Sequence, residues 1–120
     1  MQTLQTKYAG LTLRNPIIIG SSGLTNTVDK IKELERAGAG AVVLKSLFEE
    51  QILMQSEHLL KEAESYPEAY DYVREYVKSN DIKSYIDLIS DAKKYTSIPI
   101  IASINCYEKG SWADFAQRIE

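Results

Sequence analysis

Three expected strands end in residues that could bind a small ligand. The first, Ile17 to Ile19, leads into Gly20-Ser21-Ser22-Gly23, where small residues leave backbone N–H groups accessible. The second ends at Lys45-Ser46, and the third at Asn105-Cys106-Tyr107. Ligands of parallel α/β folds gather at the carboxyl ends of strands, so these ends are expected to share one rim. Hydroxyls, an ammonium, an amide and bare N–H groups suit a planar ring with polar edges.

Lys45 is the most informative of these residues. It directly follows Val42-Val43-Leu44, which places its ammonium at the mouth of an apolar sheet. Desolvating an unpaired ammonium is costly, and a negatively charged ligand would remove that cost. The anionic edge of a reduced flavin is one such ligand. A solvated lysine and a generic Ser-Ser-Gly turn remain the alternative interpretation.

The composition argues against several classes of function. The chain has 14 Lys and Arg against 17 Asp and Glu, a net charge of -3, which gives no basic excess for nucleic acid or an acidic membrane. No apolar run approaches the roughly 20 residues of a membrane span. The single cysteine, Cys106, allows no internal disulfide and fits a reducing, cytoplasmic location. With His58 as the one histidine, a zinc cluster is not expected.

The spacing of apolar residues predicts one domain over residues 1–120 in which strands alternate with helices. Strands are expected around a turn at Ala9-Gly10 within 4–13, and at 17–19, 41–44 and 98–104. Helices are expected after a cap at Asn26 and Asp29 as far as Gly38, over 47–64, from Tyr66, from Asp81 to Ala92, and after Ser111.

The alternation of buried strands and helices implies a parallel sheet. Ile17 to Ile19 and Ala41 to Leu44 are continuous apolar runs, which are typical of strands buried on both faces. Strands that alternate with helices in this way belong to α/β folds. Three parallel strands seldom close on themselves, so the chain is expected to be part of a larger fold.

Three stretches in this order resemble one known family. "LTLRNPIIIGSSG" followed by "AGAGAVVLKS" resembles the amino-terminal part of the dihydroorotate dehydrogenases. There a hairpin, an Asn-Pro, an apolar strand ending in small residues, a helix and a strand ending in Lys-Ser or Lys-Thr follow one another. "IPIIASI" resembles the third strand of that family. The similarity covers about residues 8–46 and 98–104.

The resemblance implies a fold and a cofactor site. The fold is the amino-terminal part of a (β/α)8 TIM barrel, with an amino-terminal β-hairpin and three parallel strands, and FMN binds at its top. The residues that would face the flavin are Ser21, Ser22, Gly23, Lys45, Ser46 and Asn105. Lys45 would also lie near the carboxylate of the substrate.

The implied activity is that of an FMN-dependent oxidoreductase of pyrimidine biosynthesis, which oxidises dihydroorotate or a related dihydropyrimidine. One hydrogen leaves the substrate as a proton to a base, and the other leaves as hydride to the flavin. The family's base follows the fourth strand and has no counterpart before Glu120. No catalytic residue is therefore expected within this chain, and the 120 residues alone are expected to be inactive.

Two alternatives remain open. The Asn-rich loop that holds orotate in the family is replaced here by residues 47–81, so the pyrimidine substrate is not fixed, and a dihydropyrimidine dehydrogenase-like flavin domain is the sibling interpretation. The other alternative is a non-catalytic half-barrel that forms a homodimer or assembles with a partner chain. Open edges of a parallel sheet require cover, and the tyrosine-rich segment Tyr66 to Tyr85 is the candidate covering surface.

Overall fold

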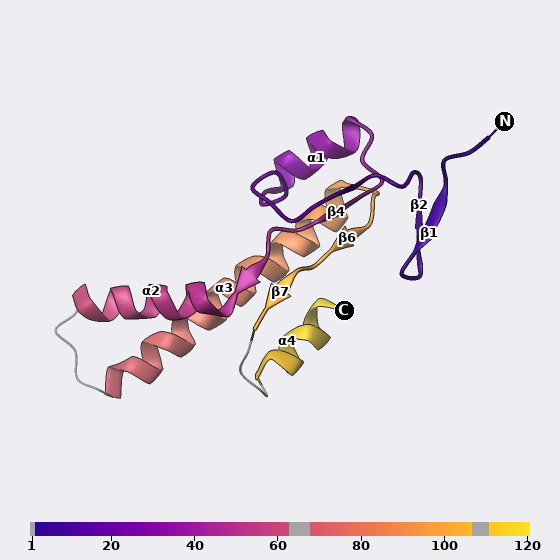
Figure 1. The fold of residues 1–120 in the computed structure, drawn as a ribbon. Coiled ribbons are helices and arrows are strands. Elements are labelled where there is room, and N and C mark those ends of the chain that lie inside the picture. The colour runs from indigo at the N-terminus through magenta and orange to yellow at the C-terminus, as the bar shows by residue number, and fades with distance from the viewer. Residues whose placement is uncertain (1, 63–67, 107–110) are drawn as a thin grey trace. The chain divides into compact units, whose positions relative to one another are not determined.

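The computed structural model describes residues 2–62, 68–106 and 111–120. These residues form two compact units that interleave along the sequence (Figure 1). The first unit comprises residues up to Ser46 together with Leu88–Ser103, and the second comprises Leu47–Asp87 and Ile104–Glu120. Helix α3 belongs partly to each unit.

The chain begins with the predicted hairpin. Strands β1, Thr6–Tyr8, and β2, Leu11–Leu13, pair antiparallel with Tyr8 opposite Leu11. The two turn residues, Ala9 and Gly10, have φ values of 48° and 78°. Positive φ at both central residues defines the two-residue turn whose twist matches that of the flanking strands. The prediction of a hairpin around Ala9-Gly10 is confirmed.

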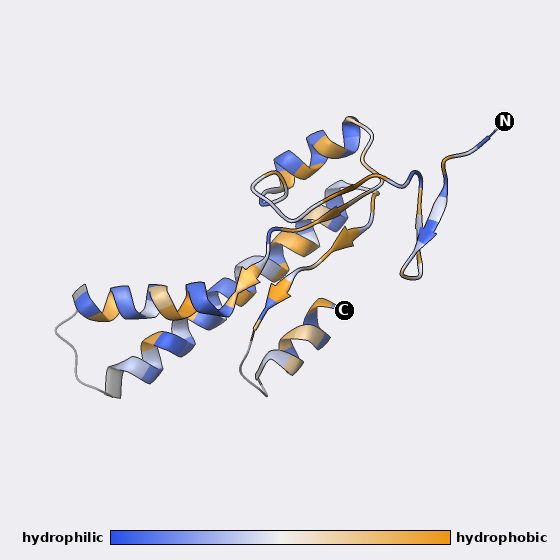
Figure 2. Cartoon of the chain, in the orientation of Figure 1, coloured by the Kyte–Doolittle hydropathy of each residue, from blue (hydrophilic) through white to orange (hydrophobic). Residues whose placement is uncertain are grey.

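The first unit is built on a parallel sheet in the order β3-β4-β6, as predicted. Its strands are β3, Ile18–Ile19, β4, Ala41–Val43, and β6, Ile100–Ile101. Ile18 lies opposite Ala41, and Val42 lies opposite Ile100. The central strand is fully buried at Ala41 and Val42, and both β4 and β6 are coloured hydrophobic in Figure 2.

The edge strand β3 differs from the prediction. Ile17 lies outside the strand and is 56% exposed, and Ile18 and Ile19 are half-buried, so the expectation of a strand buried on both faces over Ile17–Ile19 was wrong. The physical reason is position, because β3 is at the edge of the sheet and pairs on one side only.

Helix α1, Val28–Arg36, follows β3 and connects it to β4. Thr27 caps it, with an extended backbone and with its side chain accepting a hydrogen bond from Lys30 N at 3.4 Å. The predicted cap at Asn26 and Asp29 was therefore wrong by one residue. Gly38 follows the helix with a φ of 105°, which confirms the predicted left-handed end.

The segment before β3 binds the carboxyl end of α1. Arg14 Nε donates to Ala39 O at 2.9 Å, and Arg14 Nη2 donates to Glu35 O at 2.6 Å. Asn15 Nδ2 donates to Gly38 O at 2.7 Å. Glu35 is in the last turn of α1, and Gly38 and Ala39 follow the helix, so these side chains hold the segment before β3 to the end of α1.

Close backbone contact then sets the register of β3 against β4. Gly40 N donates to Ile17 O at 2.8 Å, and Ala41 N donates to the same oxygen at 3.3 Å. A Cβ on Gly40 would overlap the backbone oxygen of Asn15 and would lie 2.7 Å from its Oδ1. Only glycine fits between these groups.

The second unit contains a short parallel pair and helices. Strand β5, Leu47–Phe48, pairs with β7, Ile104–Asn105, and helices α2, Glu49–Glu62, and α4, Ser111–Ile119, follow them. The predicted helix over 47–64 was wrong at its start, because its first two residues join the β5–β7 ladder. The predicted strand over 98–104 is likewise divided between β6 and β7.

Helix α3 runs without interruption over Glu68–Tyr95. Separate helices from Tyr66 and from Asp81 had been predicted, and this division was wrong, because no Gly or Pro interrupts residues 68–95. Tyr66 lies outside the described residues. Along α3, Tyr72 and Tyr76 are exposed whereas Tyr85 is buried. Among the described helices, none combines the length and the apolar character needed to cross a membrane.

Aromatic side chains form the core of the second unit. The Phe115 ring meets Trp112 edge-on at 5.6 Å and Tyr85 at 6.2 Å between centroids. The Lys78 ammonium lies 5.0 Å above the Trp112 ring, a distance at which a cation is attracted to the ring face.

Burial raises the pKa of the Asp81 carboxyl above its ordinary value.

The described strands form an antiparallel hairpin and parallel pairs within a mixed α/β fold. They do not form a closed barrel. The described residues therefore do not show the (β/α)8 arrangement that the resemblance implies.

The close contact at Gly40 generates the first prediction. Gly40→Ala should lower the free energy of unfolding by about 1–3 kcal/mol, because the new methyl group collides with backbone that cannot move away freely. Gly20→Ala is the matched control, since a Cβ there meets no atom within 4 Å. Urea denaturation measures both variants. Equal stability of the two would contradict the packing described here.

Candidate functional site

Three serine hydroxyls lie in a row at the carboxyl end of the β3-β4-β6 sheet. Ser21, Ser46 and Ser103 each follow one of these strands by two or three residues. Ser21 Oγ lies 3.1 Å from Ser46 Oγ, and Ser46 Oγ lies 2.6 Å from Ser103 Oγ. Ser46 N also donates to Ser21 Oγ at 2.9 Å. We call these residues the serine row.

Ser22 faces its own turn instead. Its Oγ donates to Gly20 O at 3.2 Å and accepts from Leu24 N at 3.2 Å. Thr25, which is fully buried, donates from Oγ1 to Ser22 O at 3.3 Å and accepts from Ser22 N at 3.4 Å. These bonds fix the shape of the elbow formed by residues 20–25 without using the hydroxyl of Ser21.

Lys30 adds a link between α1 and the elbow. Its Nζ donates to Gly23 O at 2.9 Å and to Asn26 Oδ1 at 3.0 Å. The carbonyl of Gly23 is thereby occupied. The ammonium of Lys30 also places a positive charge on this rim of the first unit.

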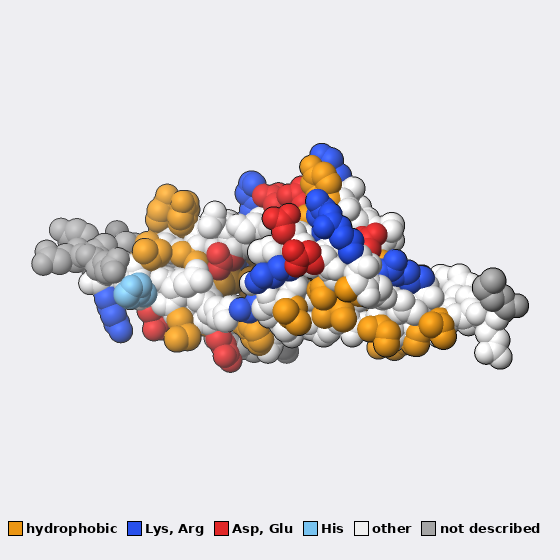
Figure 3. Space-filling view, turned by 90° about the horizontal axis from the view of Figure 1, so that it is seen from above, with side chains coloured by type: hydrophobic (Ala, Val, Ile, Leu, Met, Phe, Trp, Pro, Cys, Tyr) orange, Lys and Arg blue, Asp and Glu red, His pale blue; other side chains and the backbone are white. Residues whose placement is uncertain are grey.

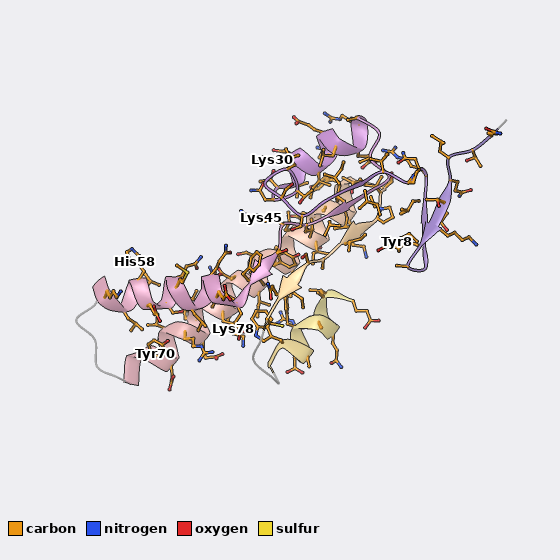
Figure 4. The ribbon with its side chains drawn as sticks, viewed as in Figure 1. Tyr8, Lys30, Lys45, His58, Tyr70 and Lys78 are labelled. Atoms are coloured by element: carbon orange, nitrogen blue, oxygen red, sulfur yellow. The ribbon has the colours of Figure 1, made fainter. Side chains whose placement is uncertain are left out.

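Lys45 lies just past β4 and is exposed (Figure 4). Within the described residues, its Nζ makes no hydrogen bond and no ion pair. An exposed ammonium on the residue before Ser46 is therefore available to an anionic group.

Neither glycine of the elbow is required by the packing of the chain. A Cβ on Gly20 or on Gly23 would meet no atom within 4 Å, and neither residue has a left-handed φ. Gly38 and Gly40, by contrast, have a conformational or a steric reason to be glycine. Open space beside bare backbone at Gly20 and Gly23 suits a flat ligand lying against the chain.

The predicted site residues are thus only partly brought together. Ser21 and Ser46 are in contact, and Lys45 is next in sequence to Ser46. Ser22 forms hydrogen bonds within the elbow, and the carbonyl of Gly23 accepts one from Lys30. Asn105 belongs to the second unit, where it is exposed in β7 opposite Phe48. Cys106 is a half-buried free thiol.

Sequence reasoning missed Ser103, Thr25 and Lys30. Ser103 could have been found, because it follows the apolar run Ile100-Ile101-Ala102 much as Ser21 and Ser46 follow theirs. Thr25 and Lys30 carry no such signal. Their roles depend on how the elbow folds back, which no periodicity encodes.

A hollow of about 370 Å³ lies at the carboxyl end of α1 and is lined by Arg14, Lys32, Glu35, Arg36 and Tyr95. Its central charged groups already have partners. The guanidinium of Arg14 binds two carbonyls, and the Glu35 carboxylate accepts from Ser97 N and from Ser97 Oγ, the latter at 2.9 Å. This cluster ties together the ends of α1 and α3 and is best explained as structural.

The charged side chains were considered as a second candidate for a binding site. Acidic and basic side chains alternate on the face shown in Figure 3, and neither sign dominates it. Over residues 2–62, 68–106 and 111–120, no group of three His, Cys, Asp or Glu side chains could hold a metal ion.

The elbow generates the second prediction. Thr25→Val keeps the shape of the side chain but removes both hydrogen bonds to Ser22, and should lower the free energy of unfolding by about 1–2 kcal/mol. Thr12→Val on the exposed surface of β2 is the control and should change stability by less than about 0.5 kcal/mol. Thermal denaturation compares them. An unaffected Thr25→Val variant would show that the elbow is held by other contacts.

Comparisons with known proteins find no match from which a family could be assigned to the chain. No protein-family model, no curated protein and no solved structure matches the chain. The case for a function therefore rests on the strand-end residues themselves.

Proposed function

We propose that the rim formed by the elbow, Lys45 and the serine row binds the ring of FMN in an oxidoreductase that oxidises dihydroorotate or a related dihydropyrimidine. The observation that carries this proposal is the serine row together with Lys45, which precedes Ser46 and whose ammonium has no partner among the described residues. In this proposal β3, β4 and β6 are the first three parallel strands of a (β/α)8 barrel. Ligands of such barrels bind at the carboxyl ends of the strands, where these residues lie.

The groups present fit an isoalloxazine ring. Hydroxyls of Ser21 and Ser46 can bond to its polar edge, and the Lys45 ammonium can neutralise the charge of its reduced form. The open backbone at Gly20 and Gly23 leaves room for the flat face. Space for a flat ring would account for glycine at positions 20 and 23, where neither φ nor packing requires it.

The residues of this rim orient and stabilise rather than transfer protons. Ser21, Ser46 and Lys45 would hold the flavin, which would supply the acceptor for the hydride that leaves the dihydropyrimidine. Lys45 would hold the substrate carboxylate and offset the negative charge that develops on the rim during reduction. Among the described residues no base is assigned to take the proton that leaves the substrate.

Lys45→Ala gives the third prediction. The variant should bind reduced FMN about tenfold more weakly, because a charge-assisted contact to the ring is lost. Its stability should change by less than about 0.5 kcal/mol, since the side chain is exposed and has no partner in the part of the chain that the structure describes. Lys93→Ala, exposed on α3, is the control. Anaerobic NMR titration measures the affinities, and equal affinity of both variants would remove Lys45 from the site.

An NMR titration with orotate or with uracil in place of FMN separates the two substrate classes. Orotate carries a carboxylate that Lys45 can bind, whereas uracil does not. A Lys45 signal that shifts with orotate alone favours a dihydroorotate dehydrogenase-like role. Equal shifts with both favour the dihydropyrimidine dehydrogenase-like alternative, and no shift with either argues against Lys45 as a substrate ligand.

A second candidate function is assembly through the uncovered edge of the sheet. Among the described strands, β3 pairs with β4 alone, and Ile17 beside it is 56% exposed. An unpaired strand edge is a template for another chain. A homodimer formed here would bury Ile17 and complete the hydrogen bonding of β3.

Light scattering after size-exclusion chromatography tests this candidate. One chain has a mass of 13.5 kDa, so an edge-paired homodimer should elute with about twice that value. Ile17→Lys should return the protein to the mass of one chain, because it places a charge in the interface. A wild-type protein that stays monomeric over a wide range of concentrations would exclude self-assembly.

A further inference from the structure

The hollow at the carboxyl end of α1 has a lining of which the tie between α1 and α3 uses only a part. Its volume of about 370 Å³ falls within the usual range of small-molecule sites, about 300–1,000 Å³. Arg14 and Glu35 supply the tie described above. Lys32, Arg36 and Tyr95 line the same hollow and take no part in the hydrogen bonds of the tie. The tie therefore does not explain these three side chains.

Tyr95 gathers two ammonium groups beside the hollow. The Lys32 Nζ lies 5.6 Å from the centroid of the Tyr95 ring, and the Lys94 Nζ lies 5.2 Å from it. The attraction of a cation to an aromatic ring holds both ammoniums here, although their charges repel each other. Because the Tyr95 side chain is 56% exposed, it positions these charges at the surface, where a ligand can reach them.

The cations at the hollow have donors to spare. Within the residues that the structure describes, Lys32, Arg36 and Lys94 form no hydrogen bond and no ion pair with a carboxylate. Arg14 donates from Nε and Nη2 to two carbonyls, while its Nη1 donates to no described group. An arginine has five N–H donors and a lysine has three, so an anion in the hollow would find several of them open.

The charges at the hollow do not balance. Arg14, Lys32, Arg36 and Lys94 are positive, whereas Glu35 is the one acidic side chain among the described residues that line the hollow. The carboxyl ends of α1 and α3 also lie here, and each helix end carries about half a negative charge. The helix dipoles therefore account for some of the cations and leave an excess of about two positive charges. The chain as a whole has the opposite sign, with a net charge of -3.

We propose that this hollow binds the dianionic phosphate group of a small molecule. A phosphate monoester carries about −1.5 to −2 charges at pH 7, which matches the excess of positive charge. The Arg36 guanidinium can donate two parallel N–H bonds to its oxygens, and Arg14 Nη1 and the Lys32 ammonium add further donors. Arg14 precedes β3, whereas the serine row follows the strands of this sheet, so the site is distinct from the proposed flavin rim and does not depend on it.

Variants that neutralise single charges should change the affinity for phosphate in opposite directions. Arg36→Gln removes a bidentate donor and should weaken the binding of inorganic phosphate about tenfold. Glu35→Gln removes the repelling charge but keeps an oxygen that can accept from Ser97, and should strengthen binding about threefold. Damage to the structure would not produce such a gain. Lys7→Gln, exposed in β1, changes the net charge as Arg36→Gln does and is the matched control.

The experiment is an NMR titration of the chain and these variants with inorganic phosphate near neutral pH, with sodium chloride adjusted to hold the ionic strength constant. Saturable shifts of the Arg36 and Tyr95 amides that respond to the variants as stated, and that acetate reproduces only weakly, support the site. Shifts that do not saturate, or that weaken equally in Arg36→Gln and Lys7→Gln, overturn it, because they report general screening. Equal affinity for acetate overturns the assignment to a dianion. If Arg36→Gln fails to fold, Lys32→Gln decides in its place.

Discussion

The approach of Gly40 to the backbone of Asn15 and Ile17 is the contact on which the rest of the first unit depends. It allows Gly40 N to reach Ile17 O, and this bond fixes which residues of β3 and β4 lie side by side. A slip of one residue along this pair would turn each side chain of the strand to the other face. The contact between Ser21 and Ser46 at the far end of the same strands follows from this register.

Much of the fold was predictable because it depends on local chemistry. The hairpin follows from Ala9-Gly10, the parallel sheet from apolar runs such as Ala41 to Leu44, and the end of α1 from Gly38. The errors arose where tertiary contacts override local preference. Leu47 and Phe48 are compatible with a helix but find a partner strand in β7, and an apolar Ile17 is exposed because its strand is at an edge.

The candidate site was less predictable than the fold. Position after a strand was enough to select Ser21, Lys45 and Ser46, since parallel strands bring their ends to one rim. It was not enough to distinguish Ser21 from Ser22, whose hydroxyl bonds to its own turn. That distinction depends on backbone angles within the elbow. The serine row also needed the third strand in register, which only the folded chain supplies.

The core of the second unit has a practical consequence. Trp112 is the single tryptophan of the chain and is only 4% exposed, with its indole Nε1 buried and without a partner among the described residues. Indole fluorescence therefore reports on the packing between α4 and α3 in the second unit. The first unit contains no indole, so its unfolding must be followed by another signal. Comparing the two signals would reveal whether the units melt together or in sequence.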